Sequence, residues 1–243
     1  SGQMPLEEYL DYTEGQTAKG ENRRTFRFTD GLTDEEGDMC GEIWGQGVEF
    51  VSGISDIWGG VYFPGGESGQ NLICLPGSLF PGNSYTLTLW IKPEEGHEWT
   101  SVIYMRYLDG FASLVPYLGD GLSIYRISED IDMANGWHDT FCRAAALHKW
   151  CFIAVTYDSF SESVCYYING RKAGYRVDVP TMLSCRQVLL GGDPFQKSYT
   201  GCVSALTVYD CVKTSEEIQE LYSAFLEEPG FCGGRESFWM EVN

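Results

Sequence analysis

The sequence predicts an all-β protein in which two antiparallel sheets pack face to face. A hairpin stands at its centre: Trp150–Tyr157 is an apolar run rich in β-branched and aromatic residues, 158–163 is polar, and Val164–Ile168 is a second apolar run before Asn-Gly. Apolar residues also alternate along Tyr85–Pro93, as in a strand with one buried face. The 243 residues, with 14% aromatic residues and 29 glycines, suit one sandwich of many strands joined by tight turns.

The central hairpin resembles the signature of laminin-G-like domains. In that family a Trp opens an apolar strand that ends Thr-Tyr-Asp, and the next strand ends Tyr-hydrophobic-Asn-Gly. The matching residues here are Trp150, Thr156-Tyr157-Asp158 and Tyr167-Ile168-Asn169-Gly170. Further segments resemble the family's other strands and its terminal helix, in family order: Gly59–Gly66, Tyr85–Pro93, Val188–Phe195, Thr200–Asp210 and Thr214–Tyr222.

This resemblance to a bacterial-type LamG module of the concanavalin A-like lectin/glucanase group covers residues 22–226. It implies a two-sheet antiparallel jelly-roll sandwich with a short C-terminal helix. We therefore expect the jelly-roll domain at 22–228. Residues 1–21, which are acidic and polar without a sustained period, are expected to be a linker or a loosely packed lead-in segment.

The first strand is expected at Arg24–Phe28, and an acidic turn follows it from Asp30 to Asp38. The turn is rich in oxygen donors, and Ca²⁺ takes about six to eight oxygen ligands in proteins. Two interpretations stay open. The turn either holds a structural calcium ion through the carboxylates of Asp30 and Asp34, or it is a solvated acidic loop.

The same region contains Glu36, Asp38 and Glu42 in a spacing that related jelly-roll glucanases use for catalysis. Retaining glycosidases need two carboxyl groups about 5–5.5 Å apart across the scissile bond. Gly37 and Gly41 interrupt a strand here, and the match lies in a turn near the start of the fold. Coincidence in an acid-rich chain explains the spacing better than catalysis does.

Residues 41–63 predict further strands, and Trp44 and Trp58 in them are expected to be core residues. In the strand Tyr85–Pro93, Trp90 has the opposite parity from the leucines. Since successive side chains of a strand point to opposite faces, Trp90 is expected on the other side of its sheet.

Three strand-like runs follow between Trp99 and Ser128, separated by Asp109-Gly110 and Gly119-Asp120-Gly121, which are signals of tight hairpin turns. If these strands form the ligand-facing sheet, one face carries a row of aromatic and basic side chains. Parity alone does not decide which of them face the ligand, and each single tyrosine is more often a core residue. The candidates are Tyr104, Arg106, Tyr117, Tyr125 and Arg126.

The stretch Glu129–Leu147 is the least regular part of the chain and exceeds the usual hairpin loop of about two to five residues. It gathers an aromatic platform, an amide and carboxylates, which suit a sugar because sugar C–H faces stack on rings while hydroxyls pair with planar polar groups. We expect Trp137 to be the stacking platform, unless it only caps the sandwich edge. The candidate ligand-binding residues are Asn135, Trp137, His138 and Asp139 here, with Tyr117, Tyr125 and Arg126 on the adjoining sheet.

The last strands are expected at Ser184–Gly192 and Cys202–Val208. Thr214 and Glu217 then have the spacing of a capping box that opens a short helix, whose apolar stripe is expected to face the core. Residues 229–243 form a C-terminal tail that is expected to add an edge strand or to lead into another domain.

Composition excludes several partners. With 16 basic against 35 acidic side chains, the formal net charge of −19 opposes nucleic-acid binding, which depends on clustered Lys and Arg. No run approaches the about 20 apolar residues that a membrane helix needs, so we expect no membrane insertion. The nine cysteines are too far apart along the predicted strands for most to pair, since disulfides need Cα atoms within about 7 Å. They are expected to be small core residues.

The resemblance implies a non-catalytic, lectin-like module that binds a poly- or oligosaccharide and belongs to a larger, secreted or cell-surface carbohydrate-active protein. The alternatives are a protein-binding adhesion domain of the same fold and, less favoured, a glycoside hydrolase or lyase. Aromatic side chains on a sheet face favour sugar, whereas a flat apolar patch of several hundred Å² favours protein. No strand carries the paired carboxylates that hydrolysis needs, and no histidine has a nucleophilic partner.

Overall fold

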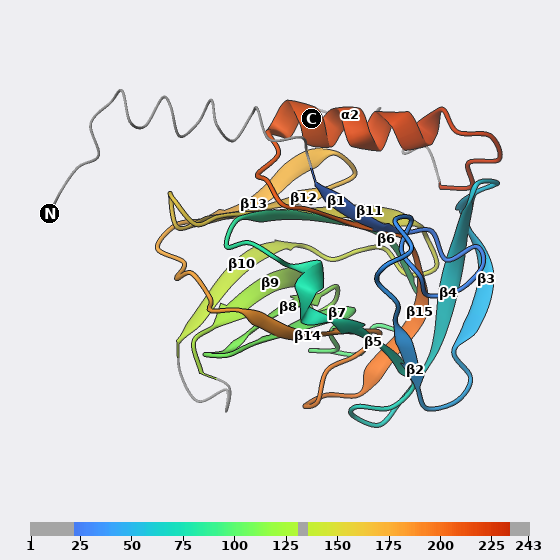
Figure 1. Ribbon diagram of the computed structural model, residues 1–243, viewed down its shortest axis with the longest axis horizontal. Coiled ribbons are helices and arrows are strands. Elements are labelled where there is room, and N and C mark those ends of the chain that lie inside the picture. Colours follow the sequence, from blue (N-terminus) through green and yellow to red (C-terminus); the bar gives the residue numbers. More distant parts are fainter. Residues whose placement is uncertain (1–21, 131–135, 234–243) are drawn as a thin grey trace, which may run out of the picture.

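Two antiparallel sheets lie face to face, and one helix covers the outside of the first (Figure 1). The computed structural model describes residues 22–130 and 136–233. The first sheet has, in order, β13 (Arg171–Arg176), β12 (Ser163–Ile168), β11 (Cys151–Asp158), β6 (Tyr85–Pro93), β15 (Ser198–Tyr209), β4 (Trp58–Gly66) and β3 (Glu49–Ser55), with β1 (Arg23–Phe26) beside β15.

The second sheet has seven strands. They are, in order, β10 (Trp137–Arg143), β9 (Leu122–Ser128), β8 (Phe111–Val115), β7 (Ile103–Tyr107), β14 (Cys185–Leu190), β5 (Leu72–Pro76) and β2 (Glu42–Trp44). A short 3₁₀ turn, η1 (Gly77–Leu79), follows β5, and the helix is α2 (Ser215–Leu226). The predicted all-β, two-sheet sandwich with a short C-terminal helix is confirmed.

The predicted central hairpin is also confirmed. Strands β11 and β12 pair from Asp158 opposite Ser163 back to Ile153 opposite Ile168, with a tight turn between them. On its other side β11 pairs with β6, from Cys151 opposite Ile91 to Tyr157 opposite Tyr85. None of the nine cysteines forms a disulfide bond in the structure.

The main core lies between the sheets and is formed by the inward-facing residues of both. Leu87, Leu89 and Ile91 of β6 face it with exposed fractions of 0%. Trp90 points the other way, as its parity predicts, into a second cluster under α2. The side chains that cover it from the helix include Tyr222 and Phe225, whose ring centroids lie 5.9 and 5.6 Å from that of Trp90.

Helix α2 begins with the predicted capping box. The Glu217 amide donates to Thr214 Oγ1 at 3.2 Å, and the Thr214 amide donates to Glu217 Oε2 at 2.7 Å. These bonds satisfy backbone donors that have no partner within the helix. In the described part of the chain no helix is long and apolar enough to cross a membrane.

Two sequence expectations are wrong here. The stretch expected to be an irregular loop contains strand β10, which pairs with β9 from Trp137 opposite Ser128 to Arg143 opposite Leu122. Its polar residues hid a regular alternation, because an edge strand faces water along one side. Trp44, expected in the core, lies on edge strand β2 and is 37% exposed.

The boundaries proposed for the termini fall largely outside the described residues, namely the lead-in at 1–21 and most of the tail at 229–243. The start of the tail packs on the first sheet: the Asp56 amide donates to Pro229 O at 3.0 Å, and the Cys232 amide donates to Ile54 O at 2.9 Å. Phe231 also joins the cluster around Trp90, with ring centroids 5.6 Å apart.

Candidate functional site

The face of the seven-stranded sheet that is turned away from the other sheet carries a hollow of about 220 Å³. Strands β7, β8 and β9 form its floor, β10 supplies one wall, and two loops form its rim. The residues that line it are Trp99, Ser101, Tyr104, Phe111, Ser113, Val115, Arg126, Trp137, Asp193, Phe195 and Gln196. We call it the aromatic hollow.

Strand register places the floor residues in one row across the sheet. Tyr104 of β7 lies opposite Ser113 of β8, which lies opposite Arg126 of β9, which in turn lies opposite Asp139 of β10. Residues beside them in sequence, such as Met105 and Tyr125, belong to the main core. The row therefore follows from the alternation of side chains along a strand.

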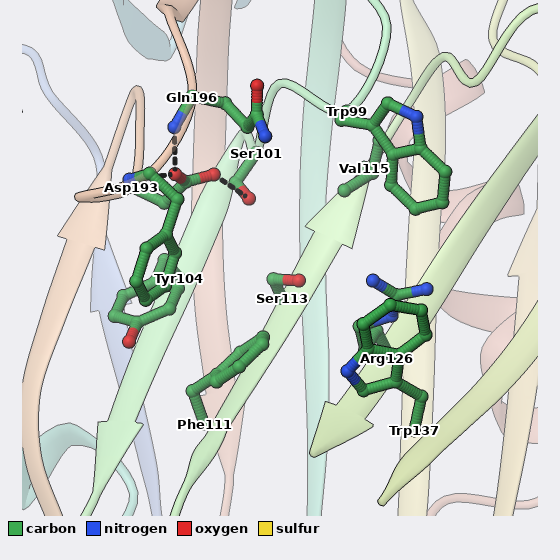
Figure 2. Close-up of a pocket in the computed structure, with 11 residues that line it drawn as sticks. Trp99, Ser101, Tyr104, Phe111, Ser113, Val115, Arg126, Trp137, Asp193 and Gln196 are labelled. Atoms are coloured by element: carbon green, nitrogen blue, oxygen red, sulfur yellow. Dashed lines mark hydrogen bonds between the residues drawn. The ribbon is translucent and has the colours of Figure 1, made fainter. Parts of the chain in front are cut away.

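Aromatic side chains stand at both ends of this row (Figure 2). Tyr104, Phe111 and Phe195 pack together at one end, with ring centroids 5.3 to 5.9 Å apart. Trp99 and Trp137 stand at the other, and Figure 2 shows Ser113 on the floor between the two groups. The Ser113 hydroxyl makes no hydrogen bond within the described residues. It is therefore available to a ligand.

Arg126 is buried among the tryptophans and is neutralised by Asp139. Its guanidinium carbon lies 4.9 Å from the ring centroid of Trp99 and 4.3 Å from that of Trp137. Arg126 Nε and Nη2 donate to the two carboxylate oxygens of Asp139, both at 2.6 Å. This bidentate pair fixes the plane of the guanidinium, which positions the two indoles around it.

The rim loops are tied together through Asp193, which is 3% exposed. Its Oδ1 accepts hydrogen bonds from the amides of Phe195 and Gln196 at 2.7 and 2.8 Å, and its Oδ2 accepts one from Ser101 Oγ at 2.5 Å. On the opposite rim Trp99 has a φ of 67°. Residues other than glycine rarely adopt this left-handed backbone conformation, and such backbone strain is concentrated at functional sites.

Burial raises the pKa of Tyr104 to about 12, while the positive charge of Arg106 acts in the opposite direction. The phenol is therefore protonated at neutral pH and can donate a hydrogen bond. With Arg126 paired to Asp139, the remaining charge in the lining is the buried carboxylate of Asp193, which neutral donors hold at the rim. The rest of the aromatic hollow offers apolar ring surface and neutral donors.

The structure brings together part of the predicted site. Trp137 and Arg126 line the aromatic hollow, and Asp139 holds Arg126 in place. Sequence reasoning missed the contributions of Trp99, Ser113, Phe195 and Gln196. One available signal was the alternation of side chains along the strand. Ser113 interrupts an otherwise apolar strand, and it faces the same side of the sheet as Arg126, which lies opposite it on the next strand.

Three other predicted ligand residues lie elsewhere. Tyr125 is wrong as a ligand contact because it is 0% exposed in the core, with its hydroxyl bonded to that of Tyr85. His138 faces the opposite side of β10 from Trp137, and its Nε2 lies 3.2 Å from Glu129 Oε2. Tyr117 is half-buried beside Gly96 and does not line the aromatic hollow. Asn135 lies outside the described residues.

The two carboxylates of the acidic turn that were expected as calcium ligands lie in different surroundings. Asp34 is buried, its Oδ2 accepts a hydrogen bond from Arg24 Nη1 at 2.9 Å, and its Oδ1 accepts from the amides of Gly37 and Met39. Arg24 thus supplies the positive charge that a calcium ion would bring, whereas Asp30 is exposed. In residues 22–130 and 136–233, no group of three acidic, His or Cys side chains is placed to hold a metal ion.

The carboxylates with a glucanase-like spacing do not converge either. Asp38 pairs with Arg24, and Glu42 Oε2 accepts a hydrogen bond from Trp44 Nε1 at 3.2 Å. Glu36 is exposed in the turn. None of the three lines the aromatic hollow.

Solved structures with a similar fold include carbohydrate-related and toxin domains. Domain 4 of AbnA, a GH43 extracellular arabinanase from Geobacillus stearothermophilus solved with arabinotriose, is 22% identical, with a TM-score of 0.70 over 84% of this chain and 100% of that one. The binding domain of Paraclostridial Mosquitocidal Protein 1 is 15% identical, with a TM-score of 0.66 over 85% of this chain and 52% of that one.

The botulinum neurotoxin serotype G binding domain is 14% identical, with a TM-score of 0.63 over 83% of this chain and 50% of that one. This chain therefore spans about half the length of the toxin structures. A comparison with curated protein sequences found no significant match. The sequence model of the concanavalin A-like lectin/glucanases superfamily matches residues 67–219, which is more than half of the chain. The chain belongs to the concanavalin A-like lectin/glucanases superfamily.

Proposed function

We propose that this domain is a non-catalytic carbohydrate-binding module and that it holds a sugar unit in the aromatic hollow. The observation that carries the proposal is the combination of half-exposed indoles with polar groups between aromatic walls. Trp99 and Trp137 are 39% and 47% exposed beside Ser113 and Arg126. A sugar presents C–H faces to such rings and hydroxyls to such polar groups.

The size of the aromatic hollow indicates what part of a glycan enters it. At about 220 Å³ it is smaller than the roughly 300–1,000 Å³ of sites for drug-sized ligands. We infer that one sugar unit is seated, either at a chain end or at a branch, while the rest of the glycan lies along the open sheet face.

A related structure supports this function and suggests a first ligand. The AbnA domain was solved with arabinotriose and belongs to an extracellular arabinanase. Arabino-oligosaccharides are therefore the first ligands to test. The same comparison supports a place outside the cell and in a longer carbohydrate-active protein.

The absence of catalysis is part of the proposal. Hydrolysis of a glycosidic bond needs two carboxyl groups with separate roles. The carboxylates at the aromatic hollow are Asp193, which accepts three hydrogen bonds, and Asp139, which is paired with Arg126. Both therefore serve to hold other residues in position.

Trp137→Ala tests the function. Truncating an aromatic anchor costs about 2 kcal/mol or more of binding free energy, roughly thirtyfold in Kd. We expect this loss for arabinotriose by isothermal titration calorimetry, with an unchanged melting temperature. Phe141→Ala is the matched control, since Phe141 is 53% exposed on the same strand but does not line the aromatic hollow.

The alternative is a protein-binding adhesion domain. Phe141 favours it, because it is exposed on the same face and lies beyond the residues a sugar would touch. If Phe141→Ala removed binding to a partner while Trp137→Ala changed no glycan affinity, the adhesion function would replace the one proposed.

A further inference from the structure

A second hollow of about 330 Å³ lies on the same sheet, and its charge differs from that of the first. Its lining includes Arg106 of β7 together with Arg186 and Gln187 of β14. Arg106 follows Tyr104, a floor residue of the aromatic hollow, by two positions on one strand. At about 3.3 Å per residue this places the two sites roughly 7 Å apart along β7. We call the second site the arginine hollow.

A β-bulge turns the second arginine into this site. The pairing of β14 with β7 passes from Cys185 opposite Tyr107 to Gln187 opposite Arg106, which leaves Arg186 without an opposite residue. Neighbours in a regular strand point to opposite faces, yet Arg186 and Gln187 both line the arginine hollow. Bulges re-aim side chains in this way and are frequent beside functional sites.

The bulge is supported by close packing from below. A Cβ added at Gly77, in the 3₁₀ turn η1, would collide with the backbone of Cys185 and Arg186. Any residue other than glycine would displace the bulged strand. This packing fixes the backbone at Arg186, and with it the direction in which its side chain leaves the strand.

The two arginines have no partner that explains their placement. Within the described residues neither makes an ion pair or a hydrogen bond, and both are exposed. Asp109, in the turn after β7, does not pair with either arginine. Its Oδ1 accepts a hydrogen bond from the Leu183 amide at 2.8 Å. Like charges on adjacent strands repel one another. In a chain with a net charge of −19, gathering two of the 16 basic side chains in one hollow suggests an anionic ligand.

We propose that Arg106, Arg186 and Gln187 form an anion subsite for a carboxylate of the same glycan whose neighbouring unit occupies the aromatic hollow. This inference rests on the proposed function and makes the ligand an acidic oligosaccharide. A guanidinium presents a planar fork of donors that matches a carboxylate. The Gln187 amide nitrogen donates one hydrogen bond to Cys74 Sγ at 3.2 Å, and its second N–H adds a donor beside the arginines. Both hollows open on one sheet face, so a single short chain reaches both.

The test compares trigalacturonate with its carboxyl-reduced form, in which each carboxylate is replaced by a neutral hydroxymethyl group on the same sugar backbone. We expect the acid form to bind about tenfold more tightly to the unmodified protein by calorimetry. This advantage should shrink as salt is added, because exposed charges are screened. The double variant Arg106→Gln/Arg186→Gln should lose the advantage while its affinity for the reduced form changes less than twofold.

Arg23→Gln is the matched control, since it removes an exposed arginine from the other sheet and should keep the full advantage. Equal binding of the two forms, with Trp137 still required, would overturn the anion subsite and leave the proposed function standing. Preference for a sulfated trisaccharide over the uronate would overturn the carboxylate assignment. Failure of every glycan to bind the unmodified protein would overturn both proposals.

Discussion

Arg126 is the residue that shapes the aromatic hollow, because it lies between two indoles and is 6% exposed. A buried guanidinium is tolerated only with a well-placed partner, since removing it from water costs several kcal/mol. Asp139 is that partner, and its backbone carbonyl also accepts a hydrogen bond from Arg176 Nη1 at 3.2 Å. This ion pair therefore supports both the shape of the aromatic hollow and the stability of the domain.

Asp139→Asn should be costly for stability. It leaves the Arg126 charge without its counter-charge in a site where both side chains are largely buried. Breaking a buried pair in this way typically costs about 3–5 kcal/mol, and we expect a loss towards the lower end because the pair borders the open hollow. Urea unfolding measures the loss.

A double variant separates stability from binding at this pair. Arg126→Met/Asp139→Leu removes both charges, so it should recover most of the stability but still fail to bind the glycan. Asp139→Asn with the stability of the unmodified protein would show that the ion pair does not hold the site together.

Cysteine reactivity should follow burial. Burial raises the pKa of Cys185 to about 12 and also raises the pKa of Cys142 and Cys202, so little thiolate forms there at pH 8. Cys40 and Cys232 are exposed. We expect iodoacetamide to label these two first by mass spectrometry and all nine after denaturation. Prompt labelling of Cys185 in the native protein would contradict this assignment.

At the scale of elements, helix α2 seals the outer face of the first sheet. Its aromatic side chains cover Trp90 and Phe152. The aromatic hollow lies on the outer face of the other sheet, so the main core separates it from the helix. The helix should therefore affect stability without affecting the ligand. A substitution in the first turn of the helix tests this expectation, because the capping box consists of hydrogen bonds made by only two side chains, those of Thr214 and Glu217.

Thr214→Ala removes the N-cap oxygen that accepts from the Glu217 amide. We expect the free energy of unfolding to fall by about 1 kcal/mol, with unchanged glycan affinity. Gln219→Ala is the control, since it places the same residue at an exposed position inside the helix, where alanine is favourable. An equal loss from both variants would mean that the cap contributes nothing specific.

Strand β10 shows where sequence reasoning fails for an element. Trp137, Asp139 and Phe141 face outwards, while Thr140 and Cys142 are buried beneath them, so the strand does alternate. The inward positions are small or polar because they lie near the sandwich edge, and the hydrophobic signal is correspondingly weak. The site was therefore expected on a loop, although it is built on a strand.

At the scale of the whole molecule, the fold was predictable because its signals are local and repeated. The hairpin of β11 and β12, the alternation of β6 and the capping box at Thr214 are each confirmed within a residue or two. The site depends instead on pairings between distant segments. Asp193 and Ser101 are 92 positions apart in sequence, and no local pattern indicates that they meet.

Parity narrows one ambiguity of the sequence without resolving it. Tyr125 and Arg126 are neighbours in strand β9, so they cannot both face the ligand. The choice between them required knowing which face of the sheet is covered, and that depends on the other sheet. Tyr125 faces the core and Arg126 the hollow.

The acidic turn bears on the stability of the whole domain, and the two interpretations of the sequence make different predictions for it. A calcium ion bound only to the native state would add RT ln(1 + [L]/Kd), about 2.7 kcal/mol at a hundredfold excess over Kd. In the structure Arg24 joins Asp34 and Asp38 instead. We therefore expect the same melting temperature in EDTA and in millimolar calcium.

Arg24→Gln provides the complementary measurement. It leaves Asp34, which is buried, without its positive partner, and we expect a lower melting temperature for this variant in either solution. Arg23→Gln, one position earlier and exposed, should change the melting temperature little. The opposite result would be a melting temperature that calcium raises by several degrees in the unmodified protein and that Arg24→Gln does not change. The acidic turn would then be a metal site, and the ion pairs of Arg24 with Asp34 and Asp38 would not stabilise its conformation.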